Sequence, residues 1–152
     1  MNAEDKLKEL GLTLPPPPEP AGSYVPAVRT GNLVFVAGQL PVSEGELEFV
    51  GKVGSDLDVG HGYDAAMLCA LNALSVLKAE CGSLDSIVRV VRVCGFVNSA
   101  AGFTGQAGVV NGASELFQEV FGERGRHARL AIGAAELPLD AAVELEVTAE
   151  VE

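Results

Sequence analysis

The chain has 152 residues and a mass of 15.7 kDa, a length that fits one domain. Hydrophobic residues make up 48% and charged residues 20%, which excludes a disordered chain. A net charge of −11 disfavours nucleic acid as a partner. No apolar run is long enough for a membrane helix or a signal peptide, so we expect a cytoplasmic protein.

The N-terminal residues predict an arm attached to one domain. Residues 4–10 favour a short helix ended by Gly11, and the prolines from Pro15 to Pro20 force an extended segment. Because so few residues precede the prolines, they cannot fold alone. We therefore expect residues 1–20 to be an arm laid on a single domain of residues 21–152.

The first half of the domain reads as strands followed by a helix. Residues 24–29 and 33–37 predict a hairpin, with Pro26 indicating an edge strand, and a weak third strand is expected at 47–52. Apolar residues at helical spacing predict a helix over 64–81, ended by Gly82. A valine-rich strand at 86–97 follows. Its Arg89 and Arg92, three apart, are expected on opposite faces.

The second half completes one sheet. A helix is expected over 105–121, then strands at 126–135 and 142–152, the last with strict apolar–polar alternation. The order ββ(β)αβαββ predicts an α+β fold in which two helices cover one face of a single sheet. Since residues 33–37 are apolar on both faces, we expect self-association through the open face.

Two motifs have structural interpretations. Residues 60–65 match GxGxxA, but a loop-like segment precedes them, so we interpret the glycines as the entry to a helix rather than a dinucleotide site. Cys69, Cys81 and Cys94 form no CxxC and lie at apolar positions. We interpret them as small buried hydrophobes, and expect no metal site.

Charged residues in the last two strands are the candidates for chemistry. Arg129 has apolar neighbours, so it requires an anion: either a ligand carboxylate, or Glu144 or Glu136 in an ion pair. Glu144 and Glu146 share the polar face of the last strand. That face is either solvated or, if it lines a subunit contact, holds a desolvated acid or base.

Four segments in this order resemble the RidA/YjgF family, also called YjgF-like or L-PSP endoribonuclease proteins, over residues 21–151. Ala21-Gly22-Ser23-Tyr24-Val25 resembles the family opening, and Phe35-Val36-Ala37-Gly38-Gln39-Leu40-Pro41 its S-G-Q-(I/L)-P turn. The other two are His127-Ala128-Arg129 with Ala134-Ala135-Glu136-Leu137-Pro138, and Val143-Glu144-Leu145-Glu146-Val147.

The resemblance implies a chorismate-mutase-like fold and a homotrimer with three ligand clefts between subunits. The implied activity is hydrolysis of reactive enamine or imine acids, such as 2-aminoacrylate, to a keto acid and ammonia, without a metal or organic cofactor. By motif position Arg129 binds the carboxylate of a small acid and Glu144 orients or activates water. The other implied cleft residues are Tyr24, Asn111, His127, and the backbone of Gly38 and Ala131.

Departures from the family pattern keep two other functions open. Ala37 and Leu130 stand where the family has serine, Ala131 where it has cysteine, and His127 where it has proline. These changes favour a non-catalytic regulatory trimer that binds a small carboxylate. The second alternative is an endoribonuclease, which the net charge opposes unless four arginines form a basic patch: Arg89, Arg92, Arg124 and Arg126.

Overall fold

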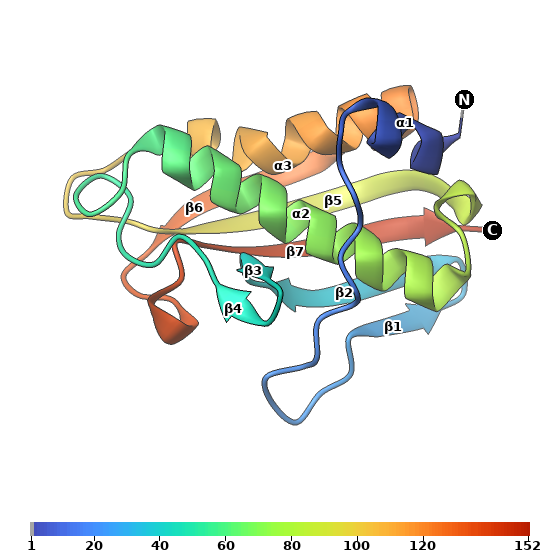
Figure 1. The fold of residues 1–152 in the computed structure, drawn as a ribbon, viewed down its shortest axis with the longest axis horizontal. Coiled ribbons are helices and arrows are strands. Elements are labelled where there is room, and N and C mark those ends of the chain that lie inside the picture. Colours follow the sequence, from blue (N-terminus) through green and yellow to red (C-terminus); the bar gives the residue numbers. More distant parts are fainter. Residues whose placement is uncertain (1) are drawn as a thin grey trace.

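The computed structural model describes residues 2–152 and is built on one five-stranded sheet (Figure 1). Only the β5–β6 pair is parallel. A separate two-stranded hairpin lies beside this sheet. In spatial order the sheet holds β1 (Ala27–Thr30), β2 (Leu33–Gln39), β7 (Val143–Val151), β5 (Ile87–Asn98) and β6 (Ala128–Ala134), and the hairpin holds β3 (Val42–Ser43) and β4 (Glu46–Leu47).

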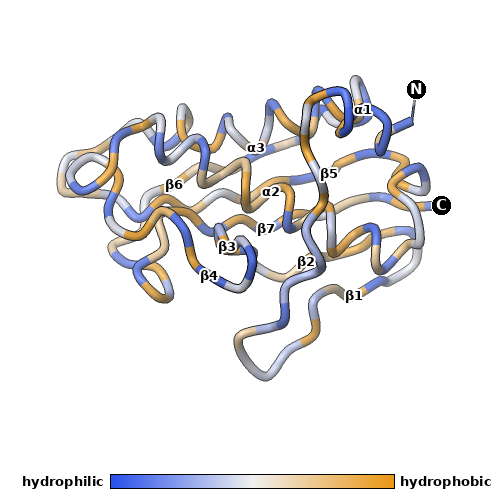
Figure 2. Tube along the Cα trace, in the orientation of Figure 1, coloured by the Kyte–Doolittle hydropathy of each residue, from blue (hydrophilic) through white to orange (hydrophobic). Residues whose placement is uncertain are grey.

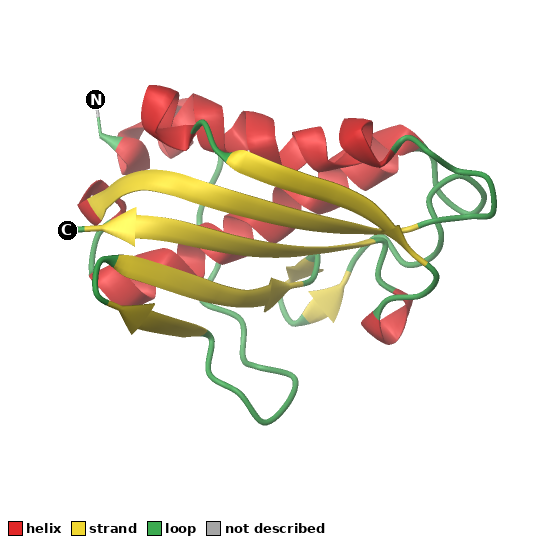
Figure 3. Cartoon of the chain, turned by 180° about the vertical axis from the view of Figure 1, so that it is seen from behind, coloured by secondary structure: helices red, strands yellow, loops and turns green. Residues whose placement is uncertain are grey.

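The helices lie on one face of the sheet and leave the other face bare (Figures 1 and 3). They are α1 (Ala3–Glu9), α2 (Val59–Cys81) and α3 (Gln106–Phe121). The core lies between α2, α3 and the sheet, and hydrophobic positions recur along α2 and the central strands (Figure 2). This arrangement confirms the mixed α+β class with one main sheet. None of the helices in residues 2–152 has the length and apolar character needed to span a bilayer.

Helix α2 begins earlier than the apolar pattern predicts. The Asp58 carboxylate accepts a hydrogen bond from the His61 backbone N–H at 2.8 Å, and His61 Nδ1 accepts from the Asp58 backbone N–H at 3.3 Å. This reciprocal cap satisfies backbone donors that the first turn leaves free. The helix therefore starts at Val59, and the glycines at 60 and 62 belong to its first turns. Their interpretation as a helix entry agrees with this cap.

The strands near the N-terminus are shorter than expected. The predicted third strand at 47–52 is wrong: β4 ends at Leu47, and Phe49 has a φ of 57°, which breaks an extended chain. Strand β1 begins at Ala27 because Pro26 has no N–H to donate, although its carbonyl accepts from the Ala37 N–H at 2.9 Å. The edge position of this strand is confirmed.

The expectation that Arg89 and Arg92 point to opposite faces is also wrong. The register of β5 with β7 shifts between Ile87 and Arg89 and again between Val90 and Arg92. Arg89 lies opposite Glu150 and Arg92 opposite Thr148, and both arginines are exposed. A bulge adds one residue to a strand and so reverses the alternation beyond it. Both arginines therefore share the bare face.

The N-terminal segment lies along the helical layer. Ala3 and Leu7 of α1 are buried, and the chain that follows crosses the outer side of α2 (Figure 1). The Ser75 hydroxyl of α2 donates to the Pro15 carbonyl. Asn72, in the same helix, donates to the carbonyls of Leu40 and Val42 at 3.0 Å each. Ser75 thus holds the N-terminal segment, and Asn72 holds the turn after β2, which leads into the site described below.

Leu145 of β7 is the core residue beside that site, and its side chain is fully buried. We expect Leu145→Ala to lower the free energy of unfolding by about 2–5 kcal/mol, because it leaves a cavity in a packed core. Leu139→Ala, at a position that is 71% exposed, is the matched control and changes stability little. Chemical denaturation measures both values. A similar small loss for the two variants would contradict the assigned core.

Candidate functional site

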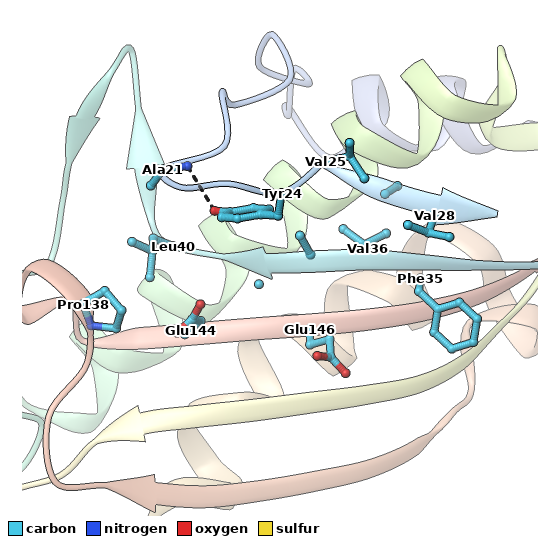
Figure 4. Close-up of a pocket in the computed structure, with 13 residues that line it drawn as sticks. Ala21, Tyr24, Val25, Val28, Phe35, Val36, Leu40, Pro138, Glu144 and Glu146 are labelled. Atoms are coloured by element: carbon cyan, nitrogen blue, oxygen red, sulfur yellow. Dashed lines mark hydrogen bonds between the residues drawn. The ribbon is translucent and has the colours of Figure 1, made fainter.

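A groove of about 660 Å³ lies on the bare face of the sheet, over β1, β2 and β7 (Figure 4). Its walls are mostly apolar, and its carboxylates are two side chains of β7, Glu144 and Glu146. Val143 and Leu145 of that strand are buried under the helices, so alternation directs Glu144 and Glu146 into the groove. Other lining residues include Tyr24, Val28, Phe35, Gly38 and Pro138.

A β-bulge in β2 brings the backbone close to Glu144. Val36 pairs with Val147 and Gln39 with Leu145, so β2 carries one extra residue at this point. The Gln39 side chain spans the bulge by donating to the Ala37 carbonyl at 3.0 Å. A Cβ on Gly38 would lie 3.1 Å from Glu144 Cδ and closer still to Oε2. Glycine is therefore required for this carboxylate to lie across β2.

Tyr24 forms the rim of the groove above Glu144 (Figure 4). Its hydroxyl accepts a hydrogen bond from the Ala21 backbone N–H at 3.1 Å, and the residue is 49% exposed. The hydroxyl thus fixes the Ala21–Tyr24 turn. Of the predicted site residues, Tyr24, Gly38 and Glu144 lie together in this groove.

Burial raises the pKa of Glu144 above its usual 4.5, and the nearby negative charge of Glu146 raises it further. Both effects disfavour the ionised form. A carboxyl with a raised pKa exchanges its proton more readily near neutral pH than an ordinary surface glutamate. Glu144 is therefore more readily protonated than an ordinary surface glutamate.

A second, polar cup of about 340 Å³ lies between α3 and the edge strand β6. Arg129 Nη1 donates to Asn111 Oδ1 at 2.7 Å and to Ser114 Oγ at 3.2 Å, and Nη2 donates weakly to the Ala107 carbonyl at 3.4 Å. All three acceptors are neutral. The cup is completed by Glu115, Gln118 and His127.

Arg129 forms no ion pair within residues 2–152, so the alternative that it pairs with Glu144 or Glu136 is wrong in this chain. It is also exposed rather than buried, because β6 is the last strand of the sheet. Neutral acceptors hold the guanidinium in place without neutralising its charge. The guanidinium therefore has no hydrogen-bonded counter-ion, although the Glu115 carboxylate also lines the cup.

The structure divides the predicted site residues between the two faces of the sheet. Arg129 bonds to α3 on the helix-covered face, together with Asn111 and His127. Glu144 lies in the groove on the bare face. Ala131 is half-buried against the core, on the face of β6 that Arg129 uses. Within one chain, Arg129 and Glu144 do not form a common site.

A family model described as "YjgF/chorismate mutase-like, putative endoribonuclease" matches residues 4–151. The chain belongs to this family. The match covers nearly the whole chain, including most of the N-terminal arm. It supports the chorismate-mutase-like fold expected from the four sequence segments.

Individual relatives of this YjgF-family chain carry different descriptions. Protein TCP17 of Trypanosoma cruzi is 46% identical over 95% of this chain and 91% of its own length. A 2-iminobutanoate/2-iminopropanoate deaminase of Dermatophagoides farinae is 30% identical over 89% of this chain and 91% of its own. The crystal structure of the Agrobacterium tumefaciens protein Atu1372, of unknown function, is 47% identical, with a TM-score of 0.93 over 99% of this chain and 92% of that one.

Sequence reasoning missed three polar residues that shape the two pockets of this YjgF-family chain. Gln39 spans the bulge, Asn72 holds the turn after β2, and Ser114 contacts Arg129. Each is at least nine-tenths buried. A polar residue on an apolar helical stripe was the available signal for Asn72 and Ser114. For Gln39 only its place in the family's turn motif pointed to the site.

The raised pKa of Glu144 predicts a stability effect that depends on pH. The folded state holds this proton more tightly than the unfolded state, so the stabilisation is present at low pH and lost as pH rises through the folded-state pKa. Glu144→Gln removes that loss. We expect its melting temperature to exceed that of the wild type by about 1–2 °C at pH 7.5 and to match it near pH 4. Calorimetry with Glu150→Gln as control measures this, and a lower melting temperature at pH 7.5 would contradict the assignment.

Proposed function

We propose that the protein hydrolyses small enamine or imine acids to keto acids and ammonia, in clefts formed between the subunits of a homotrimer. The observation that carries this proposal is the charge of Arg129. The Arg129 guanidinium is held by neutral acceptors and is exposed at a sheet edge, while the Glu144 carboxylate lies on the other face of the sheet. A second copy that places its groove against this cup would join the two groups.

Arg129 would bind the substrate carboxylate and so fix the position of the adjacent imine carbon. Glu144 of the other subunit would take a proton from water as the water oxygen attacks that carbon, and the C=N electron pair would move to nitrogen. That proton passes to nitrogen to give a carbinolamine. Glu144 then takes the carbinolamine hydroxyl proton and delivers it to nitrogen as the C–N bond breaks, so that the carbonyl forms and ammonia leaves. Tyr24 and the apolar walls would exclude bulk water. The deaminase relative supports this reaction.

A non-catalytic carboxylate-binding trimer is the alternative that the cleft residues favour. Ala37 lines the groove, and Ala131 lies on the same face of β6 as Arg129; neither supplies a hydroxyl or thiol. An endoribonuclease is favoured only by the family description. Arg89 and Arg124 donate to the backbone of Arg126 and Ile87, so basic residues do gather at one end of β5. The acidic net charge still opposes a general RNA-binding surface.

Hydrolysis is tested on imine acids generated in solution by an amino-acid oxidase or dehydratase, with keto-acid formation as the readout. We expect the wild type to accelerate hydrolysis and Arg129→Ala to reduce kcat/KM by about 100-fold, the loss of a charged, bidentate contact. Binding of a keto acid without turnover would instead support the regulatory trimer. RNA affinity that falls steeply with salt would support the endoribonuclease.

A mixing experiment tests whether the cleft lies between subunits. Arg129→Ala and Glu144→Gln chains are each expected to be inactive alone. Refolded together in equal amounts, they are expected to recover about a quarter of wild-type activity, because one interface in four then pairs an intact Arg129 with an intact Glu144. No recovery, with both variants assembled normally, would contradict a shared cleft.

Gly38 provides a separate test of the groove. We expect Gly38→Ala to displace the Glu144 carboxylate and to lower kcat about 10–100-fold, since a small displacement of a reacting group is costly. Its φ is not in the left-handed region, so the fold should be little affected. Gly108→Ala, where an added Cβ meets only Val59 at 3.7 Å and φ is not positive, serves as a control for an added methyl group outside the groove. A wild-type kcat in Gly38→Ala would indicate that Glu144 takes no part in the reaction.

A further inference from the structure

In the cup around Arg129, hydrogen bonds link the Gly125 carbonyl to His127, His127 to Ser114, and Ser114 to Arg129. The Gly125 carbonyl determines which group donates in each of these bonds. His127 Nδ1 lies 2.6 Å from the Gly125 carbonyl oxygen, and His127 Nε2 lies 2.9 Å from Ser114 Oγ. A carbonyl can only accept, so Nδ1 carries the proton of the neutral ring. Nε2 is then the acceptor, and the Ser114 hydroxyl donates to it.

The remaining lone pairs of Ser114 determine how Arg129 is held. With its proton directed at His127, the Ser114 oxygen presents an acceptor to Arg129 Nη1, 3.2 Å away. Asn111 Oδ1 takes the other Nη1 proton at 2.7 Å. Both protons of Nη1 are thus engaged. In residues 2–152 the structure gives Nε no acceptor, and Nη2 has only the weak contact with Ala107.

Three observations indicate that this arrangement is rigid. Ser114 is 5% exposed and Phe117 is fully buried. The Phe117 ring meets the His127 ring edge-on, at 6.0 Å between centroids and 89° between planes, which restricts rotation of the imidazole. Burial also lowers the pKa of His127 below its usual 6.5, which keeps the ring neutral at pH 7.

We infer that Ser114 and His127 are positioning residues that orient Arg129 so that its Nε–Nη2 edge, and not its Nη1–Nη2 end, receives the ligand carboxylate. This inference rests on the proposed function for the identity of the ligand as a carboxylate. A guanidinium presents two parallel N–H donors along that edge, which match the two oxygens of a carboxylate. The positioning role requires no contact between the ligand and either Ser114 or His127. Both act through Arg129.

The first test follows Arg129 itself, by ¹⁵N NMR relaxation of its Nε–H group, assigned with Arg129→Ala. We expect an ordered signal in the wild type and a mobile one in Ser114→Ala and His127→Leu. His127→Gln is the matched variant, because its Oε1 can accept from Ser114 where Leu cannot. It should restore the order. Equal order in wild type, Ser114→Ala and His127→Leu would overturn the inference.

The second test measures binding of pyruvate by calorimetry, with pyruvamide as the probe that lacks the carboxylate charge. We expect the pyruvate Kd to rise about tenfold in Ser114→Ala and His127→Leu and to stay within about threefold of wild type in His127→Gln. Binding of pyruvamide should not change among these variants. An equal loss for both probes would indicate a general collapse of the cup and overturn the positioning role.

The two tests separate this inference from the proposed reaction. Ordered Arg129 in the wild type and His127→Gln, lost in His127→Leu, would support the positioning role even if no imine is hydrolysed. Hydrolysis that requires Arg129 while Ser114→Ala and His127→Leu keep wild-type KM would support the reaction and overturn the positioning role. A rise in KM with a smaller change in kcat is the expected result, because Arg129 contacts the carboxylate and not the reacting carbon.

Discussion

Strand β7 pairs with β2 on one side and with β5 on the other, and its alternation divides the molecule into two environments. Val143, Leu145 and the following odd positions are buried under the helices. Glu144 and Glu146 consequently face the groove on the bare side of the sheet. A slip of one residue would exchange these sets, placing carboxylates in the core at a large cost in free energy. Core packing therefore fixes the position of Glu144 in the groove.

The edge strand β6 complements this arrangement. Because β5 and β6 are parallel, the chain returns through α3, and that helix supplies the neutral acceptors that hold Arg129. The guanidinium thus gains hydrogen bonds but no counter-ion. On the other face of the sheet, Glu144 has the neighbouring carboxylate of Glu146, and no basic side chain lines its groove in residues 2–152. Within one chain Arg129 and Glu144 therefore lie in separate pockets on opposite faces of the sheet.

Several features at these pockets lower the stability of the folded state. The half-buried Glu144 is less stable when ionised, and Leu139 and Asp140, next to the groove, have φ values of 60° and 61°. Such conformations cost free energy in residues other than glycine. Buried polar side chains offset part of this cost by satisfying backbone groups: Asn98 donates to the carbonyls of Gly51 and Ala141. The core residues around β7 supply the stability that tolerates these features.

The sequence by itself determined the α+β class and the main strands and helices, because alternation and helical periodicity report which residues must be buried. Four motifs in order indicated the family. Through the family's motifs the sequence also predicted the candidate site residues Tyr24, Gly38, Asn111, His127, Arg129, Ala131 and Glu144. The tertiary structure decided how these residues are grouped. Bulges in β2 and β5 reverse the alternation without a sequence signal, and the cap at Asp58 lengthens α2. Hydrogen bonds between residues distant in the sequence, such as those of Ser114, arise only when α3 packs beside β6, so the orientation of Arg129 is a property of the fold.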